Sequence, residues 1–424
     1  MKNTINYIVI AFLSFGSAFA QQKGVSWVHG LNSNDTFWAN SRALFEAERG
    51  QINALNSNNF SYGTRNGVDN FANQVPGNQI GIGHSMGGLA VRQATRRPNG
   101  AFEGIIACGA PLRGAKIMNS FQSGAVDNTI TSGGWTMVRG PSAQFGFASY
   151  IIAGVAANAL IPAWFNIFGT NWVNYNDQYG AQTVTDLAEN SNYMNAINGD
   201  GSEKPVRAYI WGNENSPVHW RVLSSTSRYN SNQNWQPDDD TQWVDVANTF
   251  ADVYFASFVV NSAAAVASAV SLNLGGLAYF TWVAFEWKAG SDYIRGQSES
   301  DWAWLIGADQ NYVNNTFTYT EFVCTYQHYY NECYQIGLNN PQAGQVCRDA
   351  CWQPVSYTYR YAVQAGSDGM VSGPSQRAEW TQWQVTNNDL YEAVGVNHME
   401  MRGHVNMNAR FRDVFDRPDQ LRLQ

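Results

Sequence analysis

Short apolar segments alternate with longer segments of helical pattern over the first hundred residues. Residues 25–28, 80–83 and 104–108 have the length and composition of buried strands. Between them, residues 35–49 and 89–94 carry apolar side chains near helical spacing. This order of strands and helices predicts parallel βαβ units and therefore an α/β fold.

The same pattern returns later in the chain. It predicts four further elements, namely a helix over 183–197, a strand over 206–211, a strand over 358–364 that rejoins the sheet, and a last helix over 404–415. We therefore expect a mostly parallel central sheet with helices on both faces. The segments at about 117–182 and 224–357 interrupt the pattern and are expected to be insertions into one domain over 21–424.

Two long uncharged runs, residues 140–176 and 253–285, lie in these insertions. Three interpretations are open: buried helices of an enlarged core, membrane-spanning helices, or a cap that lines an acyl pocket and contacts a lipid surface. Pro162 and two asparagines interrupt the first run, and two asparagines and a pair of glycines interrupt the second, which argues against a span. We favour a largely helical cap.

The first 20 residues have the pattern of an export signal. Lys2 provides a positive start, residues 5–15 are apolar but too short to cross a bilayer, and Ala18-Phe19-Ala20 fits the cleavage pattern. We expect the mature chain to begin at Gln21. The protein is therefore predicted to be secreted or periplasmic.

The chain is acidic, with 25 Lys and Arg against 33 Asp and Glu and a formal charge of −8. This balance argues against nucleic acid or an anionic membrane as the main partner. The acidic turn Asp238-Asp239-Asp240 is expected to be solvated, with calcium binding as the less favoured alternative.

Four of the five cysteines lie close together, at Cys324, Cys333, Cys347 and Cys351. In an exported protein they predict two disulfides, with three pairings open. A zinc site is the alternative, because thiolates also bind zinc. Cys108 falls in an apolar strand and is expected to be a buried free thiol.

The strongest chemical signal is Gly83-His84-Ser85-Met86-Gly87. Gly-x-Ser-x-Gly between an apolar strand and a helix predicts a nucleophile elbow, which lifts the serine hydroxyl above the sheet. Side chains at the glycines would collide with the neighbouring backbone. His29-Gly30-Leu31 and Gly109-Ala110-Pro111 also follow predicted strands, so three loops meet at the edge where parallel sheets carry active sites.

These segments, with Asp368-Gly369 and Asn397-His398, resemble secreted bacterial lipases and carboxylesterases of the α/β-hydrolase superfamily. They occur in that family's order of oxyanion loop, serine, acid and histidine. The resemblance covers roughly residues 24–116, 183–223 and 358–424. It implies an α/β-hydrolase fold and a serine mechanism that needs no cofactor and no metal.

The resemblance makes Ser85 the nucleophile and His398 the general base. His404 is the competing base, but it begins the last predicted helix and could serve as its cap. His29 and His84 adjoin the oxyanion loop and the serine, and we expect both to have structural roles rather than to act as bases. His219 and His328 carry no specific signal.

Asp368 is the expected acid that orients the histidine, and Glu214 is the alternative. The backbone N–H groups of Leu31 and Met86 are expected to form the oxyanion hole. The predicted function is a secreted hydrolase of carboxylic esters, with lipids or long-chain acyl esters as substrates. An acyltransferase, amidase or thioesterase would use the same triad, and a non-catalytic lipid- or partner-binding protein is the alternative from another class.

Overall fold

The computed structural model describes residues 23–33, 35–50, 53–56, 64–97, 100–145, 179–200, 206–214, 220–222, 242–271, 274–322, 327–379, 381–382 and 385–423. The predicted export signal, most of the first uncharged run, His219, Asp238-Asp239-Asp240 and Cys324 lie outside these residues. The chain divides into two compact units. One comprises the chain up to Ala115, Asn176–Asn213 and Gly373–Gln424, and the other comprises Lys116–Tyr175 and Glu214–Ser372.

The first unit is built on a parallel sheet of six strands in the order β2-β1-β3-β4-β5-β8. The strands are β1 (Gly24–Val28), β2 (Asn53–Asn56), β3 (Ile80–His84), β4 (Gly104–Cys108), β5 (Val206–Asn213) and β8 (Leu390–Val394). Each neighbouring pair is parallel. Buried strands β1, β3 and β4 are apolar along most of their length, as expected for a sheet covered on both faces. The α/β prediction is therefore confirmed.

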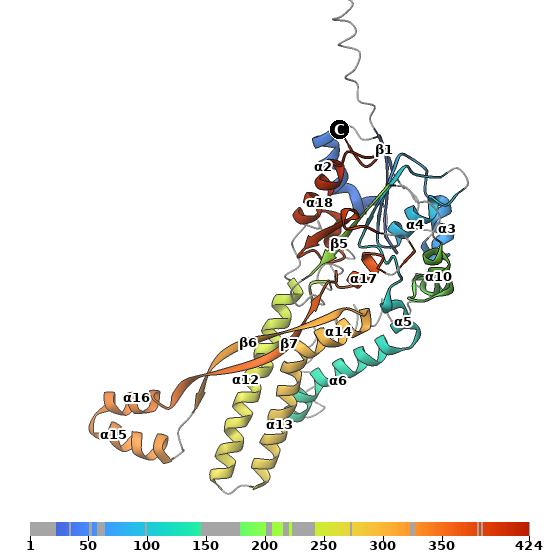
Figure 1. The fold of residues 1–424 in the computed structure, drawn as a ribbon. Helices are drawn as coiled ribbons and strands as arrows, with labels where there is room; N and C mark the ends of the chain where they lie inside the picture. Colours follow the sequence, from blue (N-terminus) through green and yellow to red (C-terminus); the bar gives the residue numbers. More distant parts are fainter. Residues whose placement is uncertain are drawn as a thin grey trace, which may run out of the picture. The chain divides into compact units, whose positions relative to one another are not determined.

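Helices from distant parts of the sequence cover this sheet. On one side lie α2 (Ala39–Arg49) and α18 (Val405–Phe415), and on the other lie α3 (Val68–Gln74) and α4 (Met86–Ala94) (Figure 1). Phe45 of α2 packs edge-on against Phe411 and Phe415 of α18 at 5.5 and 5.1 Å between ring centroids. The remaining elements of the unit are short: η1 (Asp35–Trp38), α9 (Ala181–Leu187), α10 (Asn192–Gly199), α17 (Gly373–Gln376), η7 (Asn387–Asp389) and η8 (Glu400–Arg402).

The second unit is mainly helical. Its helices are α5 (Lys116–Gln122), α6 (Ala125–Phe145), α12 (Gln242–Val270), α13 (Leu274–Asp292), η5 (Tyr293–Gln297) and α14 (Ser298–Ile306). Helices α12 and α13 form an antiparallel pair, joined where the Ser291 hydroxyl donates to the Ala251 carbonyl over 3.0 Å. None of the described helices is both long enough and apolar enough to span a bilayer.

A two-stranded antiparallel ribbon also belongs to the second unit. It pairs β6 (Asp309–Phe322) with β7 (Trp352–Ala365), from Asp309 opposite Ala365 to Phe322 opposite Trp352. The prediction of a core strand over 358–364 is therefore wrong, since this segment is the end of β7 and pairs with β6. The pattern along 358–364 predicts a strand correctly but does not identify its partner.

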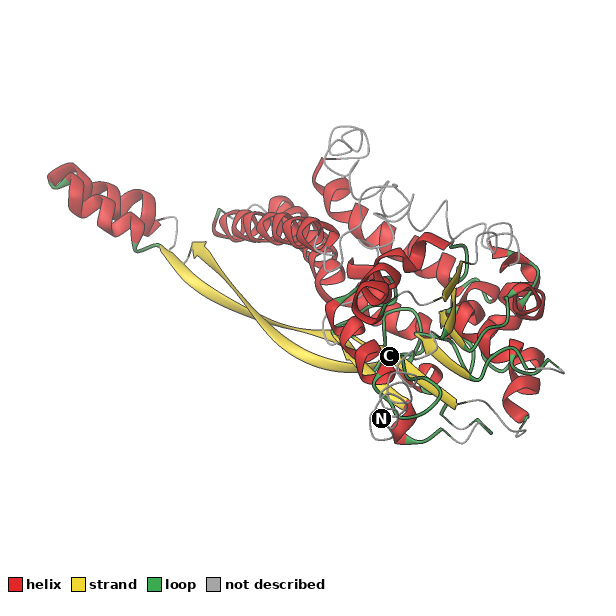
Figure 2. Ribbon diagram, turned by 90° about the horizontal axis from the view of Figure 1, so that it is seen from above, coloured by secondary structure: helices red, strands yellow, loops and turns green. Residues whose placement is uncertain are grey.

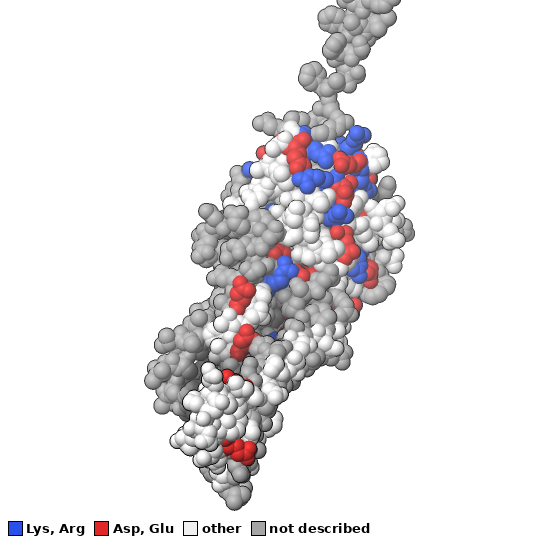
Figure 3. Space-filling view, turned by 90° about the vertical axis from the view of Figure 1, so that its left-hand side faces the viewer, with Lys and Arg blue, Asp and Glu red and all other residues white. Residues whose placement is uncertain are grey.

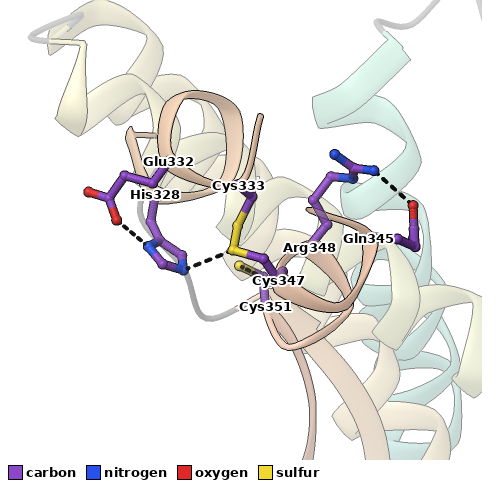
Figure 4. The surroundings of a disulfide bond; sticks show 7 residues. All are labelled: His328, Glu332, Cys333, Gln345, Cys347, Arg348 and Cys351. Atoms are coloured by element: carbon purple, nitrogen blue, oxygen red, sulfur yellow. Dashed lines mark hydrogen bonds and ion pairs between the residues drawn. A yellow bond between two sulfur atoms is a disulfide. The ribbon is translucent and has the colours of Figure 1, made fainter. Parts of the chain in front are cut away.

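A small helical tip lies at the far end of the ribbon (Figure 2). It contains η6 (Gln327–Glu332), α15 (Cys333–Asn339) and α16 (Pro341–Asp349). A disulfide joins Cys333 to Cys347 (Figure 4). Cys351 is also disulfide-bonded. This confirms the prediction of disulfides for these cysteines. His328 Nε2 lies 3.7 Å from Cys347 Sγ, but the zinc alternative would require thiolates that the disulfide consumes.

Candidate active site

Ser85 forms a strained turn between β3 and α4. Its backbone has φ 53° and ψ −126°, a conformation that non-glycine residues rarely adopt. The Ser85 N–H donates to the Cys108 carbonyl over 2.9 Å, so the turn is fixed to the neighbouring strand β4. Such strain costs about 1–3 kcal/mol and persists only where the surrounding structure enforces it. The turn therefore has the backbone that a nucleophile elbow requires.

Two glycines allow this turn to form. A Cβ on Gly83 would lie 2.2 Å from the carbonyl oxygen of Gly87, and a Cβ on Gly87 would lie 2.4 Å from that of His29. Neither approach is compatible with a side chain. The Gly-x-Ser-x-Gly pattern thus lets α4 pack directly against the end of β3 and against the loop that follows β1.

That loop brings Gly30 against the serine. A Cβ on Gly30 would lie 2.9 Å from Ser85 Cβ. His29 is buried, and its Nδ1 lies 2.8 Å from the Gly30 carbonyl oxygen, which can only accept, so Nδ1 donates. Because a trans peptide places C=O and N–H on opposite sides, the following Leu31 N–H points away from His29. His29 therefore fixes the orientation of one expected oxyanion donor.

The other expected donor, the Met86 N–H, is at the first position of α4. The first N–H groups of a helix have no partner within the helix and carry its positive dipole end. Met86 itself is fully buried, so its side chain anchors this helix start. The position suits a group that must stabilise negative charge next to Ser85.

His398 lies in the loop between β8 and α18 and is 6% exposed. Its neighbours form a reciprocal cap. Asn397 Oδ1 accepts from the N–H groups of Met399 and Glu400 at 3.0 and 3.2 Å, and the Asn397 N–H donates to Glu400 Oε2 over 2.9 Å. This arrangement holds the histidine loop in one conformation. The Asn-x-x-Glu spacing was a readable signal for it in the sequence.

His84 connects the elbow to this loop. Its Nε2 donates to the backbone carbonyl of His398 over 2.9 Å, and the two rings lie 4.6 Å apart between centroids. Phe37 stacks on the other side of His84 at 4.2 Å. Burial, reinforced by the nearby charge of His398, lowers the pKa of His84 well below 6.5. The His84 ring is therefore neutral, with its hydrogen on Nε2.

His404 has a different place. It is the N-cap of α18, and its Nδ1 accepts from the Asn406 N–H over 3.1 Å. A ring nitrogen used in this way satisfies one of the open donors at the helix start. His404 therefore caps α18, as the alternative to its role as the general base had suggested.

Both candidate acids belong to the second unit and lie next to each other. The Glu214 N–H donates to the Ser367 carbonyl over 2.7 Å, directly before Asp368. Glu214 forms an ion pair with Arg221. Asp368 is fully buried, and its Oδ1 accepts from the N–H groups of Met370 and Val371 at 3.0 and 2.8 Å.

Two glycines flank the turn around Asp368. Gly366 and Gly369 have φ of 63° and 87°, and the Trp302 indole donates to the Gly369 carbonyl over 2.6 Å. Cys108, next to the site on β4, is buried and free as predicted, and burial raises the pKa of its thiol well above 9.0. A neutral, fully buried thiol is not a nucleophile.

Comparison with protein-family models found no match, and no curated protein matches the chain either.

Proposed function

We propose that this protein is an exported serine hydrolase of carboxylic esters, with an α/β-hydrolase fold and the second unit as its cap. One observation carries the proposal. Ser85 is held in a strained turn at the end of a central parallel strand, and the residue before it binds the backbone of His398. An ordinary turn of glycine and serine can form without a non-glycine residue in this costly backbone conformation.

The proposed chemistry proceeds through an acyl-enzyme. His398 takes the hydroxyl proton as Ser85 Oγ attacks the ester carbonyl carbon, and the Met86 and Leu31 N–H groups stabilise the oxyanion. The resulting imidazolium gives that proton to the departing alcohol. Water then attacks the acyl-serine by the same route. Asp368 would accept a hydrogen bond from His398 and stabilise its charged form.

The preference for acyl esters rests on the second unit. Residues 253–285 contain no charged side chain, and helices α12 and α13 are apolar on more than one face. A cap of this composition suits alkyl chains better than sugars or peptides. The same triad would serve an amidase or thioesterase, so matched amide and thioester substrates belong in the test.

The test combines a reactive probe with a substrate series. A fluorophosphonate should label the wild type and leave Ser85→Ala unlabelled, whereas a non-catalytic binding protein would not be labelled at all. Nitrophenyl esters from acetate to palmitate should then show higher kcat/KM for the longer chains. A strong preference for acetate would remove the lipase assignment and leave the esterase assignment.

A further inference from the structure

The helical tip of the second unit holds a carboxylate, an imidazole and a disulfide next to one another. His328 Nδ1 lies 2.7 Å from Glu332 Oε2, and His328 Nε2 lies 3.7 Å from Cys347 Sγ (Figure 4). Because a carboxylate only accepts hydrogen bonds, Nδ1 donates, and Nε2 of the neutral ring turns its lone pair toward the sulfur. A ring nitrogen of His328 and the sulfur atoms of Cys333 and Cys347 all lie within 4.8 Å of one another. One imidazole is therefore close to both sulfur atoms of the disulfide.

This imidazole has the surroundings of a general base. A histidine that is oriented by a carboxylate can take up a proton, because the carboxylate stabilises the imidazolium that forms. An imidazolium next to a cysteine in turn favours the thiolate, which is the form that attacks disulfides. A disulfide that only joins two helices needs no such base. The pair of Glu332 and His328 therefore suits a disulfide that opens and closes.

The two sulfur atoms belong to residues of different exposure. Cys333 is fully buried, whereas Cys347 is partly exposed. The side chains of His328 and Glu332 beside it are 42% and 56% exposed. A sulfur atom of another molecule can therefore approach Cys347 more easily than Cys333. This makes Cys347 the outer, attacking cysteine and Cys333 the inner cysteine that resolves a mixed disulfide.

The two helices of the tip also pack against each other through their backbones. A Cβ on Gly344 would lie 2.4 Å from the Cα of Gly337 and 3.0 Å from the Cys333 carbonyl oxygen. At the start of α16, Asn340 Oδ1 accepts from the Ala343 N–H over 3.1 Å. These contacts do not involve the sulfur atoms. We therefore expect the tip to keep its shape when the disulfide opens.

Exposed apolar side chains flank the disulfide. Tyr334 follows Cys333, Val346 precedes Cys347, and both apolar residues are more than half exposed. Leu338 of α15 is exposed as well. The described surface of the second unit is mostly white in Figure 3, which shows how sparse charged side chains are on that face. Such side chains can bind the apolar residues that an unfolded polypeptide exposes, whereas a small charged thiol gains little from them.

We propose that the tip exchanges disulfides with the cysteines of unfolded polypeptides, with Cys347 as the attacking sulfur, Cys333 as the resolving sulfur and His328 as the base. This activity goes beyond ester hydrolysis, because it uses no residue of the proposed active site.

Each half of the exchange transfers two electrons. A thiol of the polypeptide gives its proton to His328, and its sulfur attacks Cys347 Sγ. The bond between the two cysteines breaks with its electron pair on Cys333, which takes the proton from His328. A second thiol of the polypeptide then attacks the polypeptide sulfur of the mixed disulfide, and Cys347 leaves and receives the proton of that thiol through His328. The polypeptide now has a disulfide and the tip has two thiols. The reverse sequence on a mispaired disulfide returns the two electrons, so the exchange needs no other oxidant or reductant.

The test uses the mature protein carrying Ser85→Ala, with EDTA present so that no metal takes part. The probe is ribonuclease with mispaired disulfides, and the measurement is the rate at which its activity returns. We expect the protein to raise this rate at least about tenfold above that of the buffer. His328→Gln can still bind Glu332 but cannot take up a proton, and it should lower the added rate at least about tenfold. Gln342→Ala, at an exposed residue of α16, is the matched control and should leave the rate unchanged.

Two serine variants distinguish the roles of the sulfur atoms. Cys333→Ser leaves the attacking cysteine without its resolving partner, so a mixed disulfide with ribonuclease should accumulate on non-reducing electrophoresis. Cys347→Ser should accumulate none. Circular dichroism of both variants checks that they remain folded.

The inference is overturned if the parent protein does not accelerate reactivation, if His328→Gln is as fast as the parent, or if both serine variants trap ribonuclease alike. Reaction of the reduced tip with oxidised glutathione as fast as with a disulfide-linked peptide would also overturn it, because the substrate would then be a small thiol. Labelling of the protein with Ser85 intact by a fluorophosphonate tests the proposed function separately.

Discussion

His84 donates its Nε2 hydrogen to the backbone carbonyl oxygen of His398 over 2.9 Å, although 314 positions separate the two residues in the sequence. The carbonyl belongs to the proposed general base, and His84 directly precedes the proposed nucleophile. One buried side chain therefore joins the turn at Ser85 to the loop that carries His398. Its effect on activity can be separated from its effect on packing.

Replacing His84 tests this role. His84→Phe keeps an aromatic ring against Phe37 but removes the hydrogen bond from His84 to the His398 carbonyl. We expect kcat to fall about 10- to 100-fold with little change in KM, because the base is displaced from the serine. His84→Gln can still donate to the carbonyl and should recover most of the activity. Equal kcat values for the two variants would show that the hydrogen bond does not position His398.

The same residue predicts how stability depends on pH. The pKa of His84 is held well below 6.5 in the folded protein, mainly by burial, whereas the unfolded chain has an ordinary imidazole. Below about pH 6.5 the unfolded chain therefore binds a proton that the folded protein does not. The free energy of unfolding should be highest above about pH 6.5 and fall as the pH drops below it, by up to about 1.4 kcal/mol per pH unit for this group.

Urea unfolding of wild type and His84→Gln over this pH range checks the prediction. The glutamine variant should lose less stability on acidification. Its unfolded chain no longer binds a proton at residue 84 that the folded protein does not bind. Parallel curves for the two proteins would mean that His84 does not contribute to the acid sensitivity.

Substitutions of the two candidate acids are expected to affect kcat differently. Asp368→Asn should reduce kcat by about 10⁴-fold while the protein remains folded, because the amide cannot stabilise imidazolium. Glu214→Gln should keep near-normal kcat and lose some stability through its ion pair with Arg221. The measurement is kcat on a nitrophenyl ester together with a thermal unfolding curve for each variant. The reverse outcome would assign the acid role to Glu214.

The strain at Ser85 predicts a difference between two inactive variants. Ser85→Ala and Ser85→Gly both lack the hydroxyl, but only glycine tolerates φ 53° and ψ −126° at low cost. We expect Ser85→Gly to be the more stable by about 1 kcal/mol, measured by urea unfolding. A glycine variant less stable than the alanine variant would show that the turn is not strained.

Local patterns predicted the first unit well. The apolar segments at 25–28, 80–83 and 104–108 are β1, β3 and β4, and the predicted last helix is α18. The predicted helix over 183–197 is divided into α9 and α10, with Ser191 accepting from the Met194 N–H at the start of the second. Periodicity identifies such elements because each buries one face against the sheet.

Contacts between distant residues could not be predicted in this way. The ribbon pairs residue 309 with residue 365, and no local signal in 358–364 distinguishes that partner from the central sheet. The capping role of His404 was readable from its position before a helix, whereas the role of His84 depends on a carbonyl 314 residues away. Functional geometry of that kind becomes visible only with the structure.

The division of the chain also bears on how this protein is made. The first unit is interrupted twice, after Ala115 and after Asn213, and is resumed at Asn176 and Gly373. Strand β8 and helix α18 follow the second interruption, so a ribosome releases them only after the whole of the second unit. Until then the edge of β5 that will receive β8 has no partner strand. We therefore expect folding intermediates that are prone to aggregation until β8 pairs with β5.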